Sequence, residues 1–396
     1  MNLNRSLSRL VSSQTLALNQ KAKALAASGR KIYNFTAGEP DGNTPDHVQS
    51  AAIHAIQSGK NRYTDTAGII ELREAICRKA KNIYHRTYST DEVIVSSGGK
   101  QAIFNALYTL LNPEDEVVIL TPAWVSYPSL VQMLGANVVE VSSTIEQGFV
   151  PDVSAIASAI TDKTKLLILN SPCNPSGAVY TQAFVNELVD LLEKHPNVFV
   201  ISDDIYEYYV FEGEFVTLSK HPKFPKERLI IINGVSKSHA MTGWRIGYAL
   251  ADQRIVSPMK KIQSQVTSNP CSISQYAALE AIKTEDEKPN PFKESFKQRR
   301  DIAFTELSEC ADLRVILPQG AFYIFPNVEK VISKSNLQTD VELCDFLLDT
   351  CGVATVPGSA FGLPGHLRLS YGLPIEELRK GISLMKEGLS KLEKKA

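Results

Sequence analysis

Groups that can do acid–base, carbonyl and phosphate chemistry follow short apolar runs along the middle of the chain. In chain order they are Gly98, Gly99, Lys100, Trp124, Asn174, Asp203, Tyr206, Ser236, Lys237 and Arg245. Each of them alone could be a solvated charge, a tight turn or a core residue. If the runs are strands of one parallel sheet, their carboxyl ends lie at one edge, where open α/β sheets bind ligands. The pattern therefore indicates a single site.

These residue types fit the chemistry of pyridoxal phosphate. An acid such as Asp203 that pairs with the pyridine nitrogen keeps the ring protonated, so that the ring can accept electrons from a carbanion. A lysine such as Lys237 can attack a carbonyl when burial or a nearby cation lowers its pKa from the ordinary ~10.4. Arg245 and the free N–H groups of a helix that begins at the glycine turn can bind a phosphate. The phenol, the amide and the indole that could hold the ring are Tyr206, Asn174 and Trp124.

The elements that must position these groups alternate between strands and helices. The apolar runs lie at 93–96, 117–121, 137–142, 166–170, 198–202, 229–233 and 246–250. Helical patterns separate several of them, at 101–111, near 124–134, near 152–160 and at 181–194. Near-continuous apolar runs are typical of strands that are buried on both faces. We therefore predict an α/β fold in which a mainly parallel, seven-stranded sheet carries helices on both faces.

The flanking segments predict a second, smaller α+β domain. Before the sheet, helical patterns lie at 16–28, 46–58 and 69–84. After it come helices at 272–283 and 289–309, short strands near 313–317 and 322–326, and helices at 339–350 and 374–394. The predicted domains are an N-terminal arm with part of the small domain at 1–47, the large cofactor-binding domain at 48–285 and the small C-terminal domain at 286–396.

Composition disfavours several other classes of protein. The net charge of −1 gives no overall field for nucleic acid or an anionic membrane, and no apolar run approaches the ~18 residues of a membrane span. The six cysteines include no C-x-x-C pair and the histidines no H-E-x-x-H, which disfavours disulfides and metal sites and favours the reducing cytoplasm. Residues 1–38 are basic and hold no acid. A transit peptide has such a composition, but we favour a basic arm that lies on the protein.

Nine sequence motifs extend over nearly the whole chain. They are AGEPD at 37–41, NRYTDTAGIIELREAI at 61–76, SSGGKQAIFN at 96–105, PAWVSYP at 122–128, NSPCNPSGAVY at 170–180, SDDIYE at 202–207, SKSHAMTGWRIGY at 236–248, GAFYIF at 320–325 and HLRLSYG at 366–372. The run S-K-x-x-x-M-x-G-W-R-x-G-Y is highly specific. With these motifs the chain resembles the class I, fold-type I aminotransferases of the aspartate aminotransferase family.

The resemblance implies a role for each matching residue. Lys237 looks like the lysine that holds pyridoxal phosphate as a Schiff base in a ping-pong transamination and carries a proton between the substrate Cα and the cofactor C4′. Asp203 resembles the partner of the pyridine nitrogen. Arg368 resembles the residue that binds the substrate α-carboxylate, and the Gly38 backbone lies beside it in the family's sites. The implied partners of the ring are Tyr206, Asn174 and Trp124, and those of the phosphate are Gly98, Gly99, Lys100 (through its backbone), Ser236 and Arg245. Tyr63 matches a tyrosine that reaches the phosphate of the neighbouring subunit, which implies a homodimer with shared active sites.

The amino donor is less well defined by the sequence. One branch of the family binds the distal carboxylate of aspartate through an arginine just before an S-N-P segment, but residues 263–270 hold no arginine. Another branch uses a lysine in the G-G-K turn and hydroxyls of the N-terminal segment, to which Lys100, Ser13 and Thr15 correspond. Lys100 could instead point to solvent, and Ser13 could cap the helix at 16–28. We favour aspartate and 2-oxoglutarate as substrates, giving oxaloacetate and glutamate, with alanine, aromatic amino acids and prephenate as alternatives.

Three rival functions belong to other classes. Residues 234–238 nearly spell the G-x-S-x-G of serine hydrolases, but the fifth position is serine and no histidine follows with the expected acid in a recognisable context. A pyridoxal-phosphate β-lyase that acts on cysteine S-conjugates would share the same residues and release pyruvate and ammonia. A regulatory, non-catalytic member of the fold usually carries a fused DNA-binding domain, for which we expect no room in 396 residues.

Overall fold

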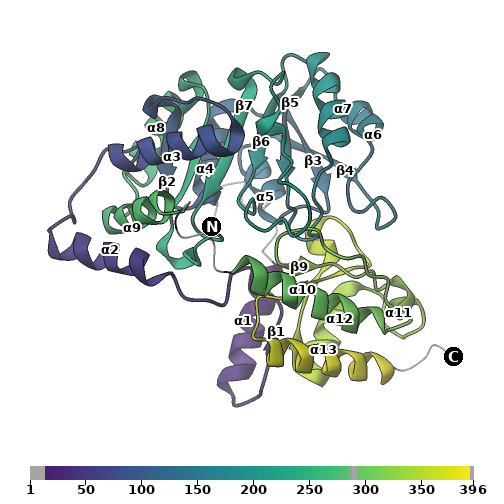
Figure 1. Cartoon of the computed structure of the whole chain (residues 1–396). Helices are drawn as coiled ribbons and strands as arrows, with labels where there is room; N and C mark the ends of the chain where they lie inside the picture. Colours follow the sequence, from purple (N-terminus) through teal and green to yellow (C-terminus); the bar gives the residue numbers. More distant parts are fainter. Residues whose placement is uncertain (1–13, 286, 288–291, 393–396) are drawn as a thin grey trace, which may run out of the picture.

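The structure is a computed structural model that describes residues 14–285, 287 and 292–392, with side chains from residue 17 onward. Figure 1 shows two bodies. The larger body is built around a twisted sheet, and the smaller body holds the first helix together with the last helices of the described chain. Because segments far apart in sequence meet in the smaller body, the chain passes twice between the two.

The sheet of the larger body confirms the predicted fold class. Its strands are β2 (Val93–Ser96), β3 (Glu116–Thr121), β4 (Asn137–Ser142), β5 (Thr164–Asn170), β6 (Phe199–Asp203), β7 (Leu229–Gly234) and β8 (Gly247–Leu250). Within the described residues the sheet has seven strands in the order β2-β8-β7-β6-β5-β3-β4. β8 runs antiparallel to both of its neighbours, and the other pairs are parallel. The sheet is therefore mainly parallel.

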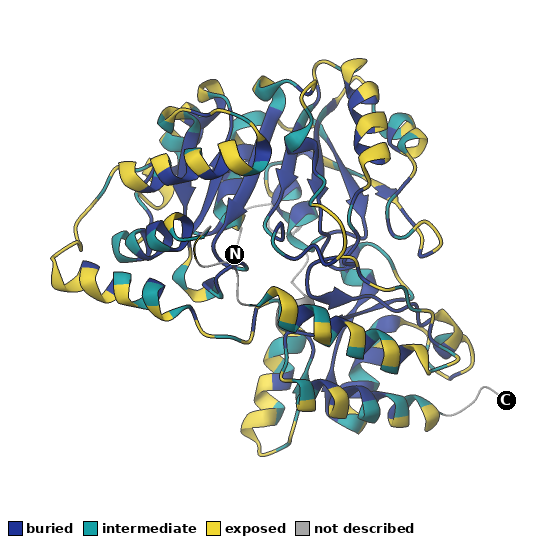
Figure 2. Cartoon of the chain, in the orientation of Figure 1, coloured by how far each residue is buried: buried dark blue, intermediate teal, exposed yellow. Residues whose placement is uncertain are grey.

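Helices cover both faces of the sheet because successive strand residues point to opposite sides. Val118 packs on one face and Ile119 on the other. The first face is covered by α2 (Asp46–Gln57), α3 (Ile70–Tyr84), α6 (Val153–Ala159), α7 (Gln182–Glu193) and α9 (Ser272–Lys283). The second face is covered by α4 (Gly99–Leu110), α5 (Ser126–Met133) and α8 (Gln253–Val266). Figure 2 shows the result, with buried strands between helices whose outer sides are exposed.

The smaller body joins the two ends of the chain. It contains α1 (Gln14–Ala27), β1 (Tyr33–Asn34), α10 (Lys293–Ser308), β9 (Tyr323–Ile324), α11 (Glu329–Ser333), α12 (Asp340–Phe346), β10 (Val353–Ala354), β11 (Val356–Pro357), β12 (Leu367–Ser370) and α13 (Ile375–Ser390). β1 pairs in parallel with β10, which places the N-terminal segment in this body. β12 lies between β11 and β9 in a three-stranded sheet. The domain boundaries given above stay a prediction.

The short elements β1, β10, β11, β12 and α11 were not predicted, and two further elements differ from the sequence-based expectation for physical reasons. One is α8, for which no helix was predicted and which contains Pro258, a residue type that usually ends a helix. Here the apolar side chains of Ile255, Val256 and Met259 are buried against the sheet, and this packing retains the helix. The other is the segment near 313–317, where the prediction of a strand is wrong. That segment makes only one isolated bridge, between Arg314 and Asn327, and Pro318, which has no N–H to donate, follows it.

A buried ion cluster anchors the turn that follows β6. Lys79, on α3, has its Nζ 2.7 Å from Glu207 and 3.2 Å from Glu285. The Tyr84 hydroxyl, on the same helix, donates to Glu207 at 3.0 Å. Burial opposes the charge of Lys79, but the two glutamates hold its pKa well above the ordinary value. The cluster therefore fixes α3 to the turn that begins at Asp203.

We expect Lys79→Met to destabilise the protein at neutral pH by about 3–5 kcal/mol, because it leaves buried carboxylates without their cation. The loss should shrink as the pH falls, since a buried carboxyl without a partner has a raised pKa in the folded state and becomes neutral on protonation. Urea unfolding between pH 5 and 8 measures both effects. Lys81→Met, at an exposed position of the same helix, is the matched control. Equal unfolding free energies for the two variants would show that the cluster does not stabilise the fold.

Candidate active site

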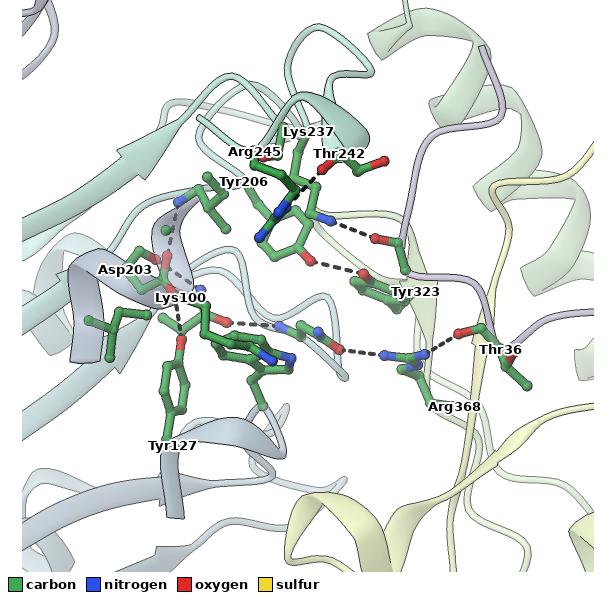
Figure 3. A pocket seen from close by; sticks show the side chains of 18 residues that line it. Thr36, Lys100, Tyr127, Asp203, Tyr206, Lys237, Thr242, Arg245, Tyr323 and Arg368 are labelled. Carbon is green, nitrogen blue, oxygen red and sulfur yellow. Dashed lines mark hydrogen bonds between the residues drawn. The ribbon is translucent and has the colours of Figure 1, made fainter. Parts of the chain in front are cut away.

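One cavity of about 240 Å³ lies at the carboxyl ends of the central strands, between the two bodies (Figure 3). Of the residues selected from the sequence, the structure brings together around it Gly38, Gly99, Lys100, Trp124, Asn174, Asp203, Tyr206, Ser236, Lys237, Arg245 and Arg368. The lining residues that were not selected are Thr36, Ile103, Tyr127, Asn170, Ile205, Thr242 and Tyr323. Residues from five strand ends thus meet in one place, as parallel strands require.

Asp203 is the last residue of β6 and lies at the bottom of the cavity. Its carboxylate accepts a hydrogen bond of 2.6 Å from the Tyr127 hydroxyl at Oδ2, and Oδ1 accepts one of 3.4 Å from the Ile205 amide. Asn170 Nδ2 donates to the Asp203 backbone carbonyl at 2.9 Å. Burial raises the pKa of Asp203 to about 6, and the hydrogen bond from Tyr127 opposes that rise. At neutral pH Asp203 is therefore mostly ionised and can pair with a cationic ring nitrogen.

Lys237 follows β7 and points into the cavity (Figure 3). Its Nζ donates a hydrogen bond of 2.6 Å to the Gly38 backbone carbonyl. Burial lowers the pKa of Lys237 to about 8; the Glu39 carboxylate opposes this shift, while Arg245 and Arg368 add to it. A lysine with such a pKa is partly neutral at physiological pH, which is the form that attacks a carbonyl carbon.

The start of α4 and Arg245 form a corner suited to a phosphate. Gly98 precedes the helix with a φ of 87°. A Cβ at Gly98 would lie 2.5 Å from Arg245 Nη2, so only glycine lets the guanidinium lie against this turn. Arg245 Nη1 donates to the Thr242 carbonyl at 2.8 Å, which orients the side chain. The free N–H groups of the first helical turn, the guanidinium and the nearby Ser236 can bind an anion together.

Lys100 extends over Trp124, with its Nζ 4.9 Å from the ring centroid. Burial, and then Arg245, lower the pKa of Lys100. The Lys100 side chain lines the cavity and is also exposed to solvent. One conformation thus combines the two alternatives, a lysine at the site and a lysine that points to solvent. The Trp124 ring in turn meets Tyr127 edge-on, with ring centroids 5.3 Å apart.

Arg368, on β12, brings a buried cation from the smaller body. Its Nη2 donates to the Thr36 carbonyl at 2.7 Å and its Nη1 to Asn174 Oδ1 at 3.1 Å. Its Nε is buried and has no hydrogen-bond partner among the described residues. A buried donor without a partner points to a ligand. Because a guanidinium binds carboxylates bidentately, Arg368 fits a substrate carboxylate.

Tyr127 and Tyr323 are the principal residues that sequence reasoning missed. The Tyr323 hydroxyl lies 2.9 Å from that of Tyr206, and its ring lies 4.7 Å from the Arg368 guanidinium carbon. Tyr127 lies in the motif PAWVSYP and Tyr323 in the motif GAFYIF, and these motifs were the only sequence signal of a role for either residue. Their partners are far away in sequence, so no local pattern assigned them a function.

Two described residues selected from the sequence, Gly98 and Tyr63, are not among those that line the cavity, although Gly98 lies against Arg245. Tyr63 is 91% exposed, and its expected role belongs to a neighbouring subunit. Ser13 lies outside the described residues, and of Thr15 only its place in the first turn of α1 is described. Their roles stay predictions.

Metal sites, membrane-spanning helices and disulfides were considered over all the described residues. In that part of the chain no cluster of His, Cys, Asp and Glu could hold a metal ion, and no helix is long and apolar enough to cross a membrane. All six cysteines are free thiols.

The fold and this site define a class, the pyridoxal-phosphate enzymes of fold type I. The profile of the class I and II aminotransferases matches residues 30–384, and the chain belongs to that family. Pyridoxal phosphate is its cofactor, and amino acids and 2-oxo acids are its substrates.

Individual relatives agree with this assignment. The chain is 43% identical to an aspartate/prephenate aminotransferase of Cereibacter sphaeroides over 96% of each chain, and 40% identical to a probable one of Aquifex aeolicus over 98% of each. Among solved structures, the aspartate aminotransferase of Rhizobium meliloti superposes with a TM-score of 0.94 at 38% identity, covering 99% of this chain and 100% of that one. The aspartate aminotransferase of Thermus thermophilus with maleate superposes with a TM-score of 0.92 at 39% identity, covering 98% and 100%.

The residues present fit the cofactor. The glycine turn and Arg245 form an anion corner in which an added Cβ would displace the guanidinium. The buried carboxylate of Asp203 lines the same cavity as Arg245, and Lys237 points into it with a lowered pKa. A phosphate, a ring nitrogen and an aldehyde thus each find a chemically matching group.

Gly98→Ala should weaken pyridoxal-phosphate binding by roughly tenfold to a hundredfold, because the new methyl group displaces a charged hydrogen-bond donor from the phosphate corner. The dissociation constant is measured by titrating the apoenzyme with the cofactor. Gly59→Ala is the matched control, since Gly59 also has a positive φ, of 70°, but nothing lies within 4 Å of its Cβ position. Equal affinities in the two variants would exclude this corner as the phosphate site.

Proposed function

We propose that this enzyme transfers the amino group of L-aspartate to 2-oxoglutarate, giving oxaloacetate and L-glutamate. The observation that carries the proposal is the presence of two cations, Arg368 and Lys100, in one cavity with Lys237. A dicarboxylic amino acid needs one cation for each carboxylate. The structure of the Thermus thermophilus relative is of a complex with maleate, which is itself a four-carbon dicarboxylate.

We infer the division of labour among the residues from their contacts. Arg368 binds the substrate α-carboxylate through the Nε that has no protein partner, while Thr36 and Asn174 hold its other nitrogens. When bound, pyridoxal phosphate supplies an electron sink for the pair left at the substrate Cα. With the cofactor bound, Lys237 Nζ would hold it at rest and would move the proton at the substrate Cα. The Asp203 carboxylate would pair with the ring nitrogen and keep it protonated.

Tyr206, Asn174 and Trp124 are proposed to hold the ring. The Tyr206 hydroxyl bonds to Tyr323, and the Asn174 backbone N–H is fixed by Asn170 Oδ1 at 3.0 Å. Trp124 presents its indole to the same cavity. Ser236 joins Gly98, Gly99, the Lys100 backbone and Arg245 at the phosphate, and the Gly38 backbone lies beside the carboxylate site.

Prephenate is the second candidate substrate, and the relatives' names favour it. Prephenate also carries a second carboxylate, at its ring, so Lys100 suits both substrates. The distinction depends on the space beyond Lys100, to which the N-terminal segment with Ser13 and Thr15 is proposed to contribute.

Lys100→Met should lower kcat/KM for aspartate and glutamate by roughly tenfold to a hundredfold, because a charge-assisted contact of about 1.5–3 kcal/mol is lost. Alanine has no distal carboxylate, so its kcat/KM should change little. Assays with each donor against 2-oxoglutarate measure this, and product analysis separates transamination from β-elimination, which would release pyruvate and ammonia. Equal losses for all three donors would assign Lys100 to the cofactor or the fold.

We also propose a homodimer with shared active sites. Large apolar side chains are exposed in and around α2 and at the start of α3, namely Ile53, Ile56, Tyr63 and Ile70. We infer that these side chains form the dimer interface, because contact with a second copy would remove them from water. A two-fold dimer would bring the partner's copy of this surface against it, and with it the partner's Tyr63 to the phosphate corner.

Mixing inactive Lys237→Ala protein with an impaired Tyr63→Ala protein should restore activity. Each mixed dimer has one site with both residues intact, so about a quarter of all sites should become active at equal mixing. Subunit exchange followed by an aspartate assay measures the recovery, and mixing Lys237→Ala with Asp203→Ala is the control, because both changes fall in the same subunit's site. A mixture no more active than the sum of its parts would contradict shared sites.

A further inference from the structure

Tyr127 ties Asp203 to the first turn of α5. The hydrogen bond of 2.6 Å from its hydroxyl joins two buried groups, with 2% of Tyr127 and 5% of Asp203 exposed. Bonds of this length between a hydroxyl and a carboxylate are charge-assisted and about twice as strong as neutral ones. Figure 3 shows the Tyr127 ring reaching from α5 toward Asp203.

No other side chain in the described structure donates to this carboxylate. The Ile205 amide donates to the second carboxylate oxygen over a longer distance, 3.4 Å. Asn170 donates to the backbone carbonyl of Asp203 and not to the side chain. The orientation of the carboxylate therefore depends mainly on Tyr127.

The same tyrosine supports the aromatic wall of the cavity. Its ring meets Trp124 at an angle of 85°, an edge-to-face contact. Both residues lie in the segment that follows β3. One side chain thus sets the positions of the acid at the bottom of the cavity and of the indole beside it.

Tyr127 remains a donor over the whole working pH range. Burial, followed by the charge of Asp203, raises its pKa well above the ordinary value of 10. The other titratable groups that face Asp203 are Lys237, from the turn after β7, and Tyr206, from the turn after β6; Cys173, after β5, faces Tyr127. Of these, only Tyr127 donates a hydrogen bond to the carboxylate.

We propose that Tyr127 is a positioning residue that keeps Asp203 ionised and aimed at the cofactor's ring nitrogen while it supports Trp124. The proposal rests on the function proposed above for Asp203. Tyr127 takes part in no proton transfer of its own. It acts through the carboxylate, and its effect is therefore on the protonation of the ring nitrogen and on the pH dependence of the reaction.

Tyr127→Phe keeps the ring and removes only the donor. Without it the Asp203 carboxylate is less stabilised and its pKa rises, so the ionised fraction falls first at low pH. We expect kcat/KM for aspartate to fall roughly tenfold to a hundredfold on the acid side of the pH profile and less at high pH. The acid limb of the profile therefore moves to higher pH. The second readout is the nitrogen chemical shift of holoenzyme loaded with pyridoxal phosphate labelled at its ring nitrogen. It should move toward the value of the unprotonated ring.

A second substitution tests the same bond in the opposite direction. Fluorotyrosine at position 127 keeps the hydroxyl and makes it a stronger donor, so the acid limb should move to lower pH. This variant also keeps the proposal testable if Tyr127→Phe folds poorly. Tyr180→Phe is the matched control, because Tyr180 is another buried tyrosine that lines the small cavity beside Tyr127.

Asp203→Asn distinguishes the proposed role of Tyr127 from the proposed role of Asp203. If the chemical shift changes in Asp203→Asn but both the shift and the pH profile stay at wild-type values in Tyr127→Phe, the positioning role of Tyr127 is wrong while that of Asp203 stands. If Asp203→Asn itself leaves the shift unchanged, the ring-nitrogen role of Asp203 is wrong, and the proposal for Tyr127 falls with it. Equal effects of Tyr127→Phe and Tyr180→Phe would reduce Tyr127 to a packing residue.

Discussion

Three ionisable groups share one cavity, with Asp203 and Arg368 buried and Lys237 partly buried, and the surrounding structure depends on this constraint. A charge that leaves water must be paired or hydrogen-bonded, or it shifts its pKa and becomes neutral. The three groups meet this requirement differently. Asp203 keeps its charge with a hydrogen bond from a phenol, Lys237 has a pKa lowered to about 8 so that part of it is neutral, and Arg368 donates to an amide oxygen and a backbone carbonyl.

The partners of these groups come from different parts of the molecule. Those of Asp203, namely Tyr127, Ile205 and Asn170, all belong to the larger body. Lys237 and Arg368 instead bond to the carbonyls of Gly38 and Thr36, in the segment that leads from β1 to α2. The geometry of the acid is thus independent of the smaller body. The geometry of the lysine and the arginine depends on how that segment crosses the cavity.

Contacts outside the cavity hold that segment and the turn after β6 in place. The Thr44 hydroxyl donates to the Ala240 carbonyl at 2.9 Å, and Asp41 pairs with Arg299 of α10 at 2.6 Å. The Lys79 cluster fixes Glu207, four residues beyond Asp203, to α3. Because protein interiors are closely packed, displacement of such anchors shifts the groups they support. The cavity is therefore supported by polar contacts on several sides.

In the proposed function, substrate discrimination depends on the chemistry of the two cations, Arg368 and Lys100. Arg368 presents a planar fork with defined directions, which suits one carboxylate in one orientation. Lys100 is a point charge on a flexible stem that lies over Trp124, and its position is less restricted. A distal carboxylate can therefore lie at more than one distance from it. This difference agrees with a site that is strict toward the α-carboxylate and more tolerant toward the rest of the substrate.

The sequence by itself determined the α/β class, the strands of the seven-stranded sheet and the end of that sheet where the site lies. Near-continuous apolar runs are recognisable locally, and parallel strands place whatever follows them at one edge, so Asp203, Lys237 and Asn174 could be grouped without coordinates. Only the tertiary structure decided which side chains orient these groups. Tyr127 and Tyr323 bond to partners 76 and 117 residues away, and the unpaired Arg368 Nε appears only once its neighbours are in place. Local patterns report periodicity and motifs, whereas contacts over such separations arise only when the sheet and the smaller body have packed together.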